Sequence, residues 1–456
     1  MTQARIAIIG AGVVGATAAL VLARAGHPVD LYSDRTAEQL RDEVPATGTA
    51  VLFGHSRDVD HTLVEELYPD APLSTGMNTR LNTGEPGALE QVLAFDPDFT
   101  YTAAGIDVRL RAHDRIRLFE EAGGSFHVET VTPEELDAVA AAHDLTLVST
   151  GKGGLSGLFP VDEARTVYRS PQRHLLAAAF TGLGHGDDVF TARGHGAGKH
   201  NVFNLHTDHG EIWIGPYWHK DVGATWSVLG FAKPDGDWVQ RWGEVTDAQS
   251  ALEVVVSIYR DYFPDDLADI EKLRVIEEDR HSWLRGAVTP TVRQGVGYTR
   301  SGRPVLALGD SAIAFDPIAG QGAQTGLIQV AALVKAIEAR GSDSRPNGSP
   351  TSSTGTGRSA ATPRRRSPVC SSAIRTTPSP PACSSPARSP TMRWVPRCSA
   401  CSPSPRRSST STRRRTSSAS SRTRRPLRRR TNGCSVPRNG HPADETPRQD
   451  QGRRRC

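Results

Sequence analysis

Two glycine-rich stretches are the parts of this sequence whose residue types and spacing could support chemistry. The first is "GAGVVG", residues 10–15, and the second is "IAGQGAQTG", residues 318–326. Glycines in such runs let a ligand approach the backbone closely, because no Cβ stands in the way. Side-chain nucleophiles are less prominent: the first 341 residues contain no cysteine, which excludes a thiol nucleophile, a disulfide and a zinc–thiolate site there.

The first glycine stretch lies in a pattern typical of a strand, a turn, a helix and a second strand. "RIAIIGAG" is a short apolar run, "VVGATAALVLARAG" predicts a helix and "PVDLYS" predicts a second strand. Gly10, Gly12 and Gly15 have the G-x-G-x-x-G spacing. In this context the spacing predicts a tight turn, an approach for a pyrophosphate and close helix–strand packing. We therefore expect a dinucleotide site.

The end of the second predicted strand leaves alternatives open. An acidic residue at this point usually holds the adenosine ribose. Here Ser33 takes that place and Asp34 and Arg35 follow. Asp34 could bind the ribose one residue late, Arg35 could contact a phosphate, or the whole stretch could be a solvated turn.

The second glycine stretch does not have the spacing of a second dinucleotide site. "LALGD" predicts a strand ending at Gly309 and Asp310, and Gly320 and Gly322 open a predicted helix, "AQTGLIQVAALVKAI". An aspartate can accept hydrogen bonds from a polyol, and a helix N-terminus stabilises negative charge such as that of a reduced isoalloxazine ring. Both turns can therefore serve one FAD: the first its pyrophosphate, Asp310 its ribityl chain and the second turn its ring.

These motifs resemble those of a known family. A G-D pair followed by D-P-x-x-G-Q-G-x-[NQ] resembles the flavin motif of FAD-dependent aromatic monooxygenases with the p-hydroxybenzoate hydroxylase fold. Within that fold the chain resembles the oxygenase component of styrene and indole monooxygenases. The matching stretches span residues 5–340 in the family's order and include "GAGVVG", "GIDVRLRAHDRIRLFEEAGG", "STGKGG", "HGEIWIGPYW", "WLRGAVTPTVR" and "VLALGDSAIAFDPIAGQGAQTG".

The resemblance implies a two-component enzyme. A separate flavin reductase supplies reduced FAD, O₂ forms a C4a-(hydro)peroxyflavin, and a small aromatic alkene of the styrene or indole type is epoxidised. The residues expected beside the flavin ring as catalytic positions are Pro317, Gly320, Gln321 and Gly322. Those expected to bind FAD are Gly10, Gly12, Gly15, Ser33, Asp34, Arg35, Arg109, Gly151, Gly309, Asp310, Gly320, Gly322, Ala323 and Gln324.

Other functions stay open beside this reading. A single-component hydroxylase that uses a nicotinamide typically has an Asp-Gly turn where this chain has Thr150-Gly151. A tryptophan-type halogenase on the same fold would carry W-x-W-x-I-P, which is absent. An inactive FAD-fold remnant with an arginine-rich nucleic-acid-binding tail is the non-enzyme alternative. The arginine and asparagine usual near residues 43–50 of the styrene group are not matched, which leaves the substrate open.

The expected fold class is α/β, with a Rossmann-like FAD-binding domain, an inserted antiparallel β-sheet substrate domain and a disordered Arg/Ser/Pro-rich tail. We place the FAD-binding domain at 1–170 and 286–341, the substrate domain at 171–285 and the tail at 342–456. Residues 36–100 give no clear pattern. We expect a cytoplasmic protein with no membrane partner, because the one apolar run near the start carries the glycines of the dinucleotide turn. A homodimer is left open.

Histidines and tryptophans in the predicted sheet are further candidate site residues. The histidines at 195, 200, 206, 209 and 219 could suggest a metal, but polar residues alternating along strands favour a solvated sheet face. No metal is therefore expected. Trp213, Trp218, Trp226 and Trp283 are read as core residues rather than as a substrate wall.

The composition changes sharply near Gly341. Up to that residue the chain has 29 basic and 46 acidic residues, and beyond it 25 arginines and 4 acidic residues, with all six cysteines. Such a segment cannot bury enough apolar surface to fold. A frameshifted translation is the favoured reading, a disordered interaction tail is a second, and nucleic-acid binding is the least favoured.

Overall fold

The computed structural model describes residues 3–46, 48, 51–194 and 199–343. The chain divides into two units, Met1–Ser379 and Pro380–Cys456, and every described residue lies in the first unit. The predicted tail lies outside the described residues apart from its first two, which end the last helix, α9 (Gly322–Asp343).

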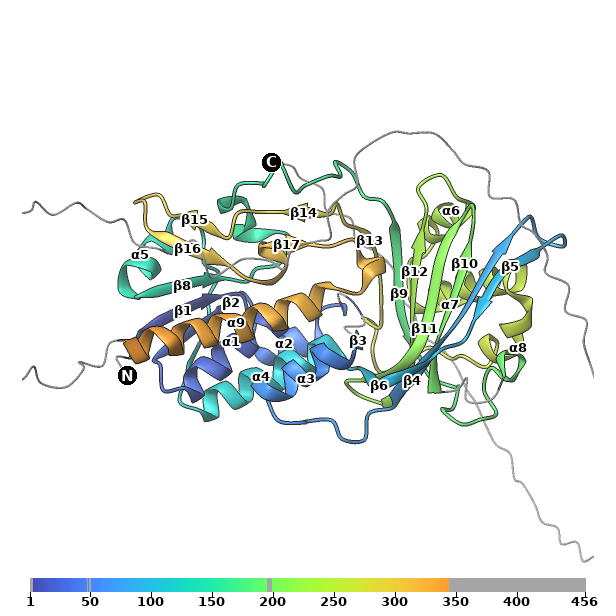
Figure 1. Cartoon of the computed structure of the whole chain (residues 1–456), viewed down its shortest axis with the longest axis horizontal. Coiled ribbons are helices and arrows are strands. Elements are labelled where there is room, and N and C mark those ends of the chain that lie inside the picture. The colour runs from blue at the N-terminus through green and yellow to red at the C-terminus, as the bar shows by residue number, and fades with distance from the viewer. Residues whose placement is uncertain (1–2, 47, 49–50, 195–198, 344–456) are drawn as a thin grey trace, which may run out of the picture. The chain divides into compact units, whose positions relative to one another are not determined.

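A six-stranded sheet carries the first glycine turn (Figure 1). The strands run in the order β15-β16-β8-β1-β2-β7, and all neighbouring pairs are parallel except β15 with β16. The bounds are β1 Ile6–Ile9, β2 Val29–Ser33, β7 Ser125–Val128, β8 Leu145–Val148, β15 Val296–Tyr298 and β16 Pro304–Ala307. Carboxyl ends of parallel strands meet at one edge of the sheet, which is where ligands bind in such folds.

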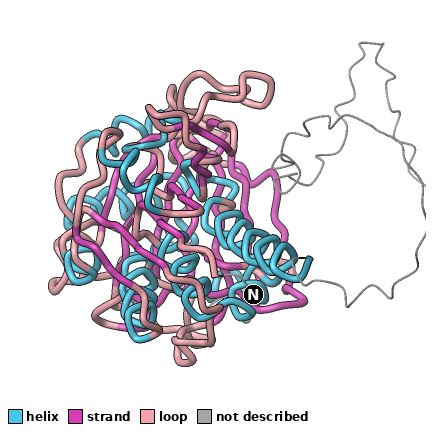
Figure 2. Tube along the Cα trace, turned by 90° about the vertical axis from the view of Figure 1, so that its left-hand side faces the viewer, coloured by secondary structure: helices cyan, strands magenta, loops and turns pink. Residues whose placement is uncertain are grey.

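Helices pack against this sheet and against one another, and Figure 2 shows helices lying beside strands in the described chain. They are α1 (Val13–Arg24), α2 (Ala37–Asp42), α3 (Gly54–Leu63), α4 (Val108–Glu121), α5 (Glu135–Ala142) and α9. The buried residues of α1 are mostly alanine, glycine and leucine, and they share one core with Ile116 and Phe119 of α4 and Val330 of α9. Small side chains on α1 let these helices approach closely.

The second sheet has nine strands and forms one wall of the site. Its order is β13-β9-β12-β11-β10-β4-β6-β3, with β5 paired to β4. The pairs are antiparallel except β10 with β4. The bounds are β3 Val51–Leu52, β4 Leu73–Thr83, β5 Glu90–Phe95, β6 Asp98–Gly105, β9 His174–Phe180, β10 His200–His206, β11 Gly210–His219, β12 Gly223–Ala232 and β13 Trp283–Ala287.

The strands at residues 51–105 resolve the region that the sequence pattern left open. They join the larger sheet through β4, whose partner β10 lies far along the chain. A parallel pairing of this kind depends on tertiary contacts, so a local pattern does not reveal it.

Three helices cover one face of the larger sheet: α6 (Asp237–Gly243), α7 (Ala248–Tyr262) and α8 (Leu267–Ile270). Trp226 and Val228 of β12 lie in one core with Trp238 of α6 and Val255 and Tyr259 of α7. The short strands β14 (Thr291–Val292) and β17 (Ile313–Ala314) pair with each other. Among the described helices, none combines the length and hydrophobicity needed to cross a membrane.

The expected α/β fold class, with a Rossmann-like sheet beside a large, mainly antiparallel sheet, is confirmed. The domain boundaries at residues 170, 285 and 341 stay a prediction. A solvated face on the second sheet is a wrong expectation, because α6, α7 and α8 cover one face and the other lines the cavity described below.

Candidate active site

The first glycine turn has a geometry that only glycine allows at two positions. Gly10 has φ +105°, and a Cβ there would lie 2.4 Å from the Ser149 carbonyl oxygen. A Cβ on Gly15 would lie 1.9 Å from the Gly10 carbonyl oxygen. At Gly12, by contrast, a Cβ would meet nothing within 4 Å. The first and third glycines thus serve the packing of turn and helix, while the second faces open space at the N-terminus of α1.

The residues after β2 form a local group of their own. The Ser33 hydroxyl accepts a hydrogen bond from the backbone N–H of Arg35 at 3.2 Å. Asp34 and Arg35 form an ion pair at 2.7 Å, with about half of each side chain exposed to solvent. None of the three lines the main cavity described below. Their predicted contacts with the adenosine end of FAD stay a prediction.

The second turn begins where β16 ends. The Asp310 carboxylate forms an ion pair with the ammonium group of Lys152 at 2.8 Å. Lys152 belongs to the turn after β8, so this pair joins two neighbouring strand ends. The backbone N–H of Gly309 donates to the side-chain oxygen of Gln329 on α9 at 2.8 Å. Gln329 was missed from sequence because it stands in no glycine motif. Lys152 was missed although it lies in the stretch "STGKGG", of which only Gly151 was expected to bind FAD.

The start of α9 is held by a buried glutamine. Pro317–Ala319 form one turn of 3₁₀ helix, and Gly320 follows with φ +61°. The Gln324 side chain, 4% exposed, donates to the Gly320 carbonyl oxygen at 2.7 Å and accepts from the Ser56 hydroxyl at 2.8 Å. Gln321 is exposed and bonds only to its own loop, at Ala319. Gln324 therefore positions the helix N-terminus, and its side chain is not among the cavity-lining groups.

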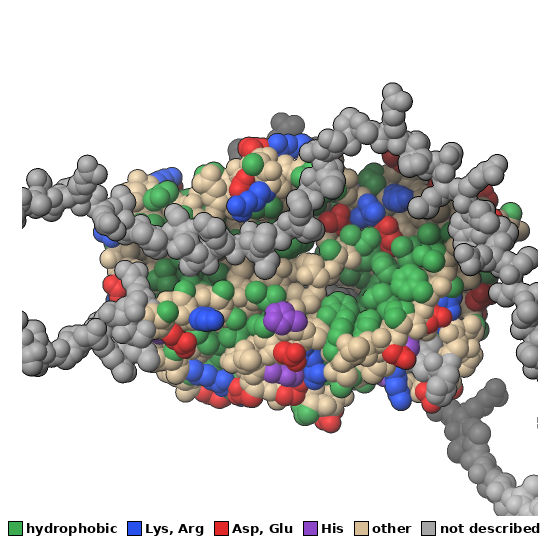
Figure 3. Space-filling model, in the orientation of Figure 1, with side chains coloured by type: hydrophobic (Ala, Val, Ile, Leu, Met, Phe, Trp, Pro, Cys, Tyr) green, Lys and Arg blue, Asp and Glu red, His purple; other side chains and the backbone are tan. Residues whose placement is uncertain are grey.

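Both turns open into one cavity of about 530 Å³. The end formed by the turns is lined by Gly12, Gly151, Lys152, Gly309, Asp310, Pro317, Gly320, Gln321, Gly322 and Ala323. The other end is apolar and is lined by Met77, Leu175, Ala177, Phe203, Trp213, Leu229, Phe231 and Leu284. Figure 3 shows hydrophobic side chains gathered in a hollow over the larger sheet.

The apolar wall follows from the alternation of side chains along the strands. Phe203 of β10 pairs with Trp213 of β11, which pairs with Leu229 of β12, which pairs with Ala177 of β9. Residues in register across neighbouring strands share a face. Trp213 thus lines the cavity, which corrects its reading as a core residue, whereas Trp226 lies on the opposite face and is core as expected.

A buried ionic cluster stands beside the cavity. Arg109, at the start of α4, forms ion pairs with Asp107 at 2.7 Å and with Asp279 at 2.6 Å. Burial acts to lower the pKa of Arg109, but its hydrogen bonds and charge contacts with both carboxylates outweigh this and raise it. Burial acts to raise the pKa of Asp279, and hydrogen bonds from His219 and Arg109 lower it overall. Arg109 lines the cavity, yet its charge is already matched.

The ligand atoms of His219, Asp221 and Asp279 lie within 4.8 Å of one another, as a metal site would require. However, the imidazole Nε2 of His219 is 3.0 Å from Asp279, and Asp279 also pairs with Arg109. Asp221 pairs with Arg41 at 2.7 Å. The geometry is therefore that of an ion-pair network, and the expectation of no metal stays a prediction.

The expectation that the sheet histidines face water is wrong. Those at 200, 206, 209 and 219 are all less than 10% exposed, and residue 195 lies outside the described residues. His206 and His209 stack with ring centroids 4.5 Å apart, and both contact the ring of Tyr262. The covering helices exclude water from His206 and His209, whereas His219 is buried by its contacts with Arg109 and Asp279.

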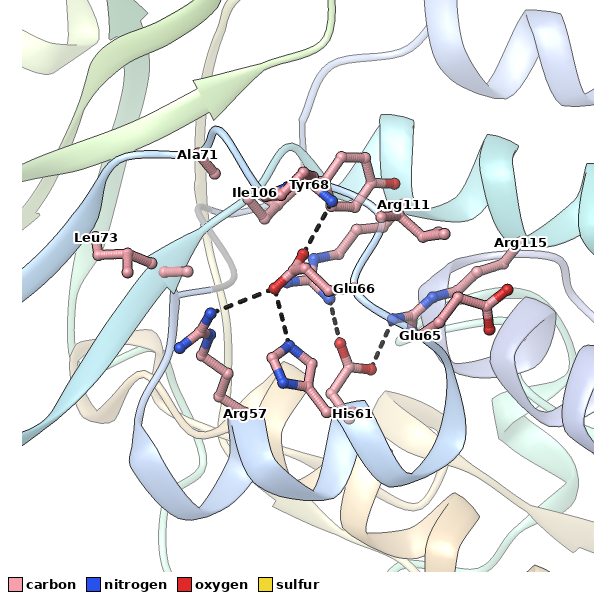
Figure 4. Close-up of a pocket in the computed structure, with 14 residues that line it drawn as sticks. Arg57, His61, Glu65, Glu66, Tyr68, Ala71, Leu73, Ile106, Arg111 and Arg115 are labelled. Atoms are coloured by element: carbon pink, nitrogen blue, oxygen red, sulfur yellow. Dashed lines mark hydrogen bonds and ion pairs between the residues drawn. The ribbon is translucent and has the colours of Figure 1, made fainter.

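A second cavity, of about 230 Å³, lies on the far side of α4 and is polar (Figure 4). Asp60 of α3 accepts from Arg111 and from Arg115, each at 2.6 Å. Glu66 points toward Arg57 and His61, at 3.3 and 3.0 Å. These contacts tie α3, the following loop and α4 together. No local pattern predicted this cavity, because its residues come from separate elements that meet only through tertiary packing.

The residues around the main cavity fit a bound FAD. The open space at Gly12, the N-termini of α1 and α9 and the carboxylate of Asp310 border one continuous cavity. Of the predicted FAD-binding residues, those that line it are Gly12, Arg109, Gly151, Gly309, Asp310, Gly320, Gly322 and Ala323, whereas Gly10, Gly15, Ser33, Asp34, Arg35 and Gln324 do not. All four predicted catalytic positions line it.

Comparisons with known proteins agree with this reading. Residues 151–268 match the family described as "Styrene monooxygenase A putative substrate binding domain". The chain is similar to "Styrene monooxygenase StyA" from a Pseudomonas species and from Pseudomonas fluorescens. Each is 24% identical over an alignment of 341 residues, and the match covers 70% of this chain and 74% of the relative.

Solved structures share the fold at low sequence identity. Halogenase PltM is 12% identical with a TM-score of 0.52, covering 75% of this chain and 70% of its own. PqsL of P. aeruginosa is 13% identical with a TM-score of 0.51, covering 76% and 89%. The myxobacterial halogenase CndH is 13% identical with a TM-score of 0.51, covering 75% and 76%. The predicted resemblance to styrene monooxygenases and the assignment as an FAD-dependent monooxygenase are thereby confirmed.

Proposed function

We propose that this FAD-dependent monooxygenase is the oxygenase component of a two-component system that epoxidises neutral aromatic alkenes of the styrene or indole type. The observation that carries the proposal is the single cavity of about 530 Å³, which has the two glycine turns at one end and the apolar wall of the larger sheet at the other. A flavin ring held at the first end and an apolar substrate at the second would face each other in this one cavity.

The chain's own part in the reaction is to bind and orient. The N-terminus of α1 at Gly12 offers backbone N–H groups to the pyrophosphate, and Asp310 offers acceptors to the ribityl hydroxyls. The N-terminus of α9, fixed by Gln324, presents N–H groups and the positive end of a helix dipole toward the ring. Bound FAD in its reduced state supplies the electrons that activate O₂.

None of the titratable side chains among the described cavity-lining residues stands free for acid–base catalysis. Of the described lining residues, Arg109, Lys152 and Asp310 are the titratable ones, and each is in an ion pair. Oxygen transfer to an electron-rich double bond needs no protein nucleophile. The wall of Phe203, Trp213 and Leu229 instead excludes water and holds an apolar ring in place.

The test supplies reduced FAD in two ways. Purified chain is incubated with styrene or indole, FAD, O₂ and NADH, either with or without an unrelated NADH-dependent flavin reductase, and epoxide or indigo is measured with catalase present. We expect product only with the reductase. Equal product from NADH alone would establish a single-component hydroxylase instead. Halide ions added to the same assay test halogenation, and a halogenated product would replace the proposal.

A further inference from the structure

A small side pocket of about 20 Å³ opens beside the main cavity. It shares Arg109 and Ala177 with the main cavity, and its other lining residues include Ala179, Tyr217, Ser227 and Ser282. A space of this size holds one water molecule or one group of similar size, since a water needs roughly 10–15 Å³. The main cavity is mainly apolar at this end, and the side pocket brings the residues Tyr217, Ser227 and Ser282 next to it.

Strand register explains why the polar groups meet there. Ser227 of β12 pairs with Ala179 of β9, and the backbone N–H of Ala179 donates to the Ser282 carbonyl oxygen at 2.9 Å. The neighbouring row on the same face is Leu229 with Ala177, which line the main cavity. The side pocket therefore lies on the same face of the sheet as the apolar end of the main cavity, next to the pair of Ser227 and Ala179. The small side chains of Ala177 and Ala179 leave the space for it.

The Ser282 hydroxyl is the strongest sign of a ligand. It is buried, with the residue 5% exposed, and it has no hydrogen-bond partner in the described part of the chain. A buried hydroxyl without a partner is costly, so a partner from outside the chain is expected. Tyr217 is 2% exposed, and burial, followed by the charge of Asp107, raises the pKa of its phenol, which stays a neutral hydrogen-bonding group.

The charges beside the side pocket select against an anion. Arg109 is the cation that lines it, and two carboxylates, Asp107 and Asp279, already pair with this guanidinium. The Nδ1 of His219 accepts from the backbone N–H of Asp221, which leaves the proton on the Nε2 that faces Asp279. No surplus positive charge remains to hold a carboxylate or a phenolate, whereas a neutral hydroxyl or amine can bond to the serine and tyrosine hydroxyls.

We propose that the side pocket is a subsite for one hydroxyl or amino substituent of a neutral aromatic ligand held in the main cavity, with Ser282 and Tyr217 as its hydrogen-bond partners. This proposal deepens the proposed function. It is tested by a binding experiment, which does not depend on the proposed function, and by a turnover experiment, which rests on it.

The binding arm uses phenol and toluene, which differ by a hydroxyl in place of a methyl. Each is titrated into the full chain loaded with oxidised FAD, and tryptophan fluorescence is read, since Trp213 lines the cavity. The ratio of the two affinities is compared among wild type, Ser282→Ala, Tyr217→Phe and Ser74→Ala. Ser74 is the matched control: it is buried on β4 of the same sheet, and its hydroxyl faces the Gly76 carbonyl oxygen at 3.3 Å, away from both cavities.

We expect the preference for phenol over toluene to fall roughly three- to tenfold in Ser282→Ala and in Tyr217→Phe, the value of one lost hydrogen bond, and to be unchanged in Ser74→Ala. Benzoate should bind more weakly than phenol throughout. A preference that does not move in either variant, or that moves equally in the control, overturns the proposal.

The turnover arm repeats the comparison with hydroxystyrene isomers against styrene, in the presence of a flavin reductase. The ratio of their kcat/KM values should fall in the two variants by the same factor as the binding ratio. If neither alkene is oxidised but the phenol preference falls as expected, the proposed function fails and the subsite stands. If both are oxidised and the ratios do not move, the subsite fails and the proposed function stands.

Discussion

Two cavities of the described chain border the same helix, α4, and differ in how its arginines are paired. In the cavity of about 230 Å³, Arg111 and Arg115 share the Asp60 carboxylate and tie α3 to α4. In the cavity of about 530 Å³, Arg109 is held by two carboxylates and Lys152 pairs with Asp310, and most of the remaining surface is glycine backbone and apolar side chains. The presence of an arginine therefore does not by itself indicate a ligand site. An arginine that already pairs with carboxylates of the chain has no unpaired charge to offer a ligand.

The difference separates holding the fold from holding a ligand. The polar cavity consists of ion pairs within the chain, so its residues should govern stability. The apolar cavity has unfilled space at Gly12 and along the Trp213 wall, so its residues should govern binding with little effect on stability. The predictions below test this separation from the largest expected effect to the smallest.

Asp60→Ala should destabilise the protein by about 3–5 kcal/mol, because it leaves two buried guanidinium groups, those of Arg111 and Arg115, without their carboxylate. Denaturant unfolding of the FAD-free protein measures this directly. Glu65→Ala is the control on the same cavity: Glu65 pairs with Arg24 at an exposed position and should cost at most about 1 kcal/mol. Equal losses in the two variants would contradict the separation.

Gly12→Glu should leave the fold intact and weaken FAD binding by roughly tenfold or more, since a carboxylate would face the pyrophosphate at the helix N-terminus. Gly12 has φ −64° and open space beside it, so a side chain is accommodated without strain. Gly12→Ala is the matched control with the same backbone and no charge. Equilibrium titration with FAD, alongside thermal unfolding, reads both effects; loss of the fold in both variants would refute the assignment of Gly12 as a ligand-facing position.

Trp213→Ala should raise the KM for styrene roughly tenfold through loss of apolar contact. Its effect on the affinity for FAD, measured without substrate, should be smaller. Trp226→Phe serves as a comparison, because Trp226 lies on the opposite face of the same sheet, in the core. We expect that substitution to lower the unfolding temperature and to leave KM unchanged. A KM that responds to Trp226 and not to Trp213 would reverse the assignment of the two faces.

Lowering the pH should reduce the stabilisation that the Asp60 ion pairs of the polar cavity contribute to the fold. Burial acts to raise the pKa of Asp60, but the charges of Arg115 and Arg111 outweigh it and lower the pKa overall. A folded pKa below the unfolded value of about 3.9 means that the stabilisation is present above that pH and is lost as the pH falls through the folded value. Unfolding free energy measured between pH 5 and 3 should fall less steeply in Asp60→Asn than in wild type. Parallel pH profiles would exclude Asp60 as a contributor.

Much of the flavin end could be predicted from sequence because the relevant constraints are local. Gly10 and Gly320 adopt a positive φ, and a Cβ on Gly15 would meet the Gly10 carbonyl oxygen of the same turn. The contact of Gly10 with Ser149 is the exception, because it joins residues far apart in the chain. The spacing of the glycines therefore predicts the backbone conformation of both turns. The Ser33–Asp34–Arg35 stretch was left undecided, and its side chains contact one another rather than the cavity.

The substrate end could not be predicted in the same way. Phe203, Trp213, Leu229 and Ala177 come from four strands, and they share a face only through the register of three strand pairs. The prediction that the sheet histidines face solvent failed for the same reason, since the helices packed on a sheet decide which of its faces is exposed to solvent. Polar alternation along a strand shows that the two faces differ, but it does not show what lies against each.

By itself, the sequence determined that the chain holds a dinucleotide-type turn and a second glycine turn suited to one flavin, because those features depend on neighbouring residues. It also determined the break in composition near Gly341. Only the tertiary structure decided that both turns open into one cavity, that Arg109 is neutralised by Asp107 and Asp279, and that Ser282 is buried beside the cavity without a partner. Contacts between residues far apart in the chain depend on how the sheets and helices pack, and no local pattern encodes that packing.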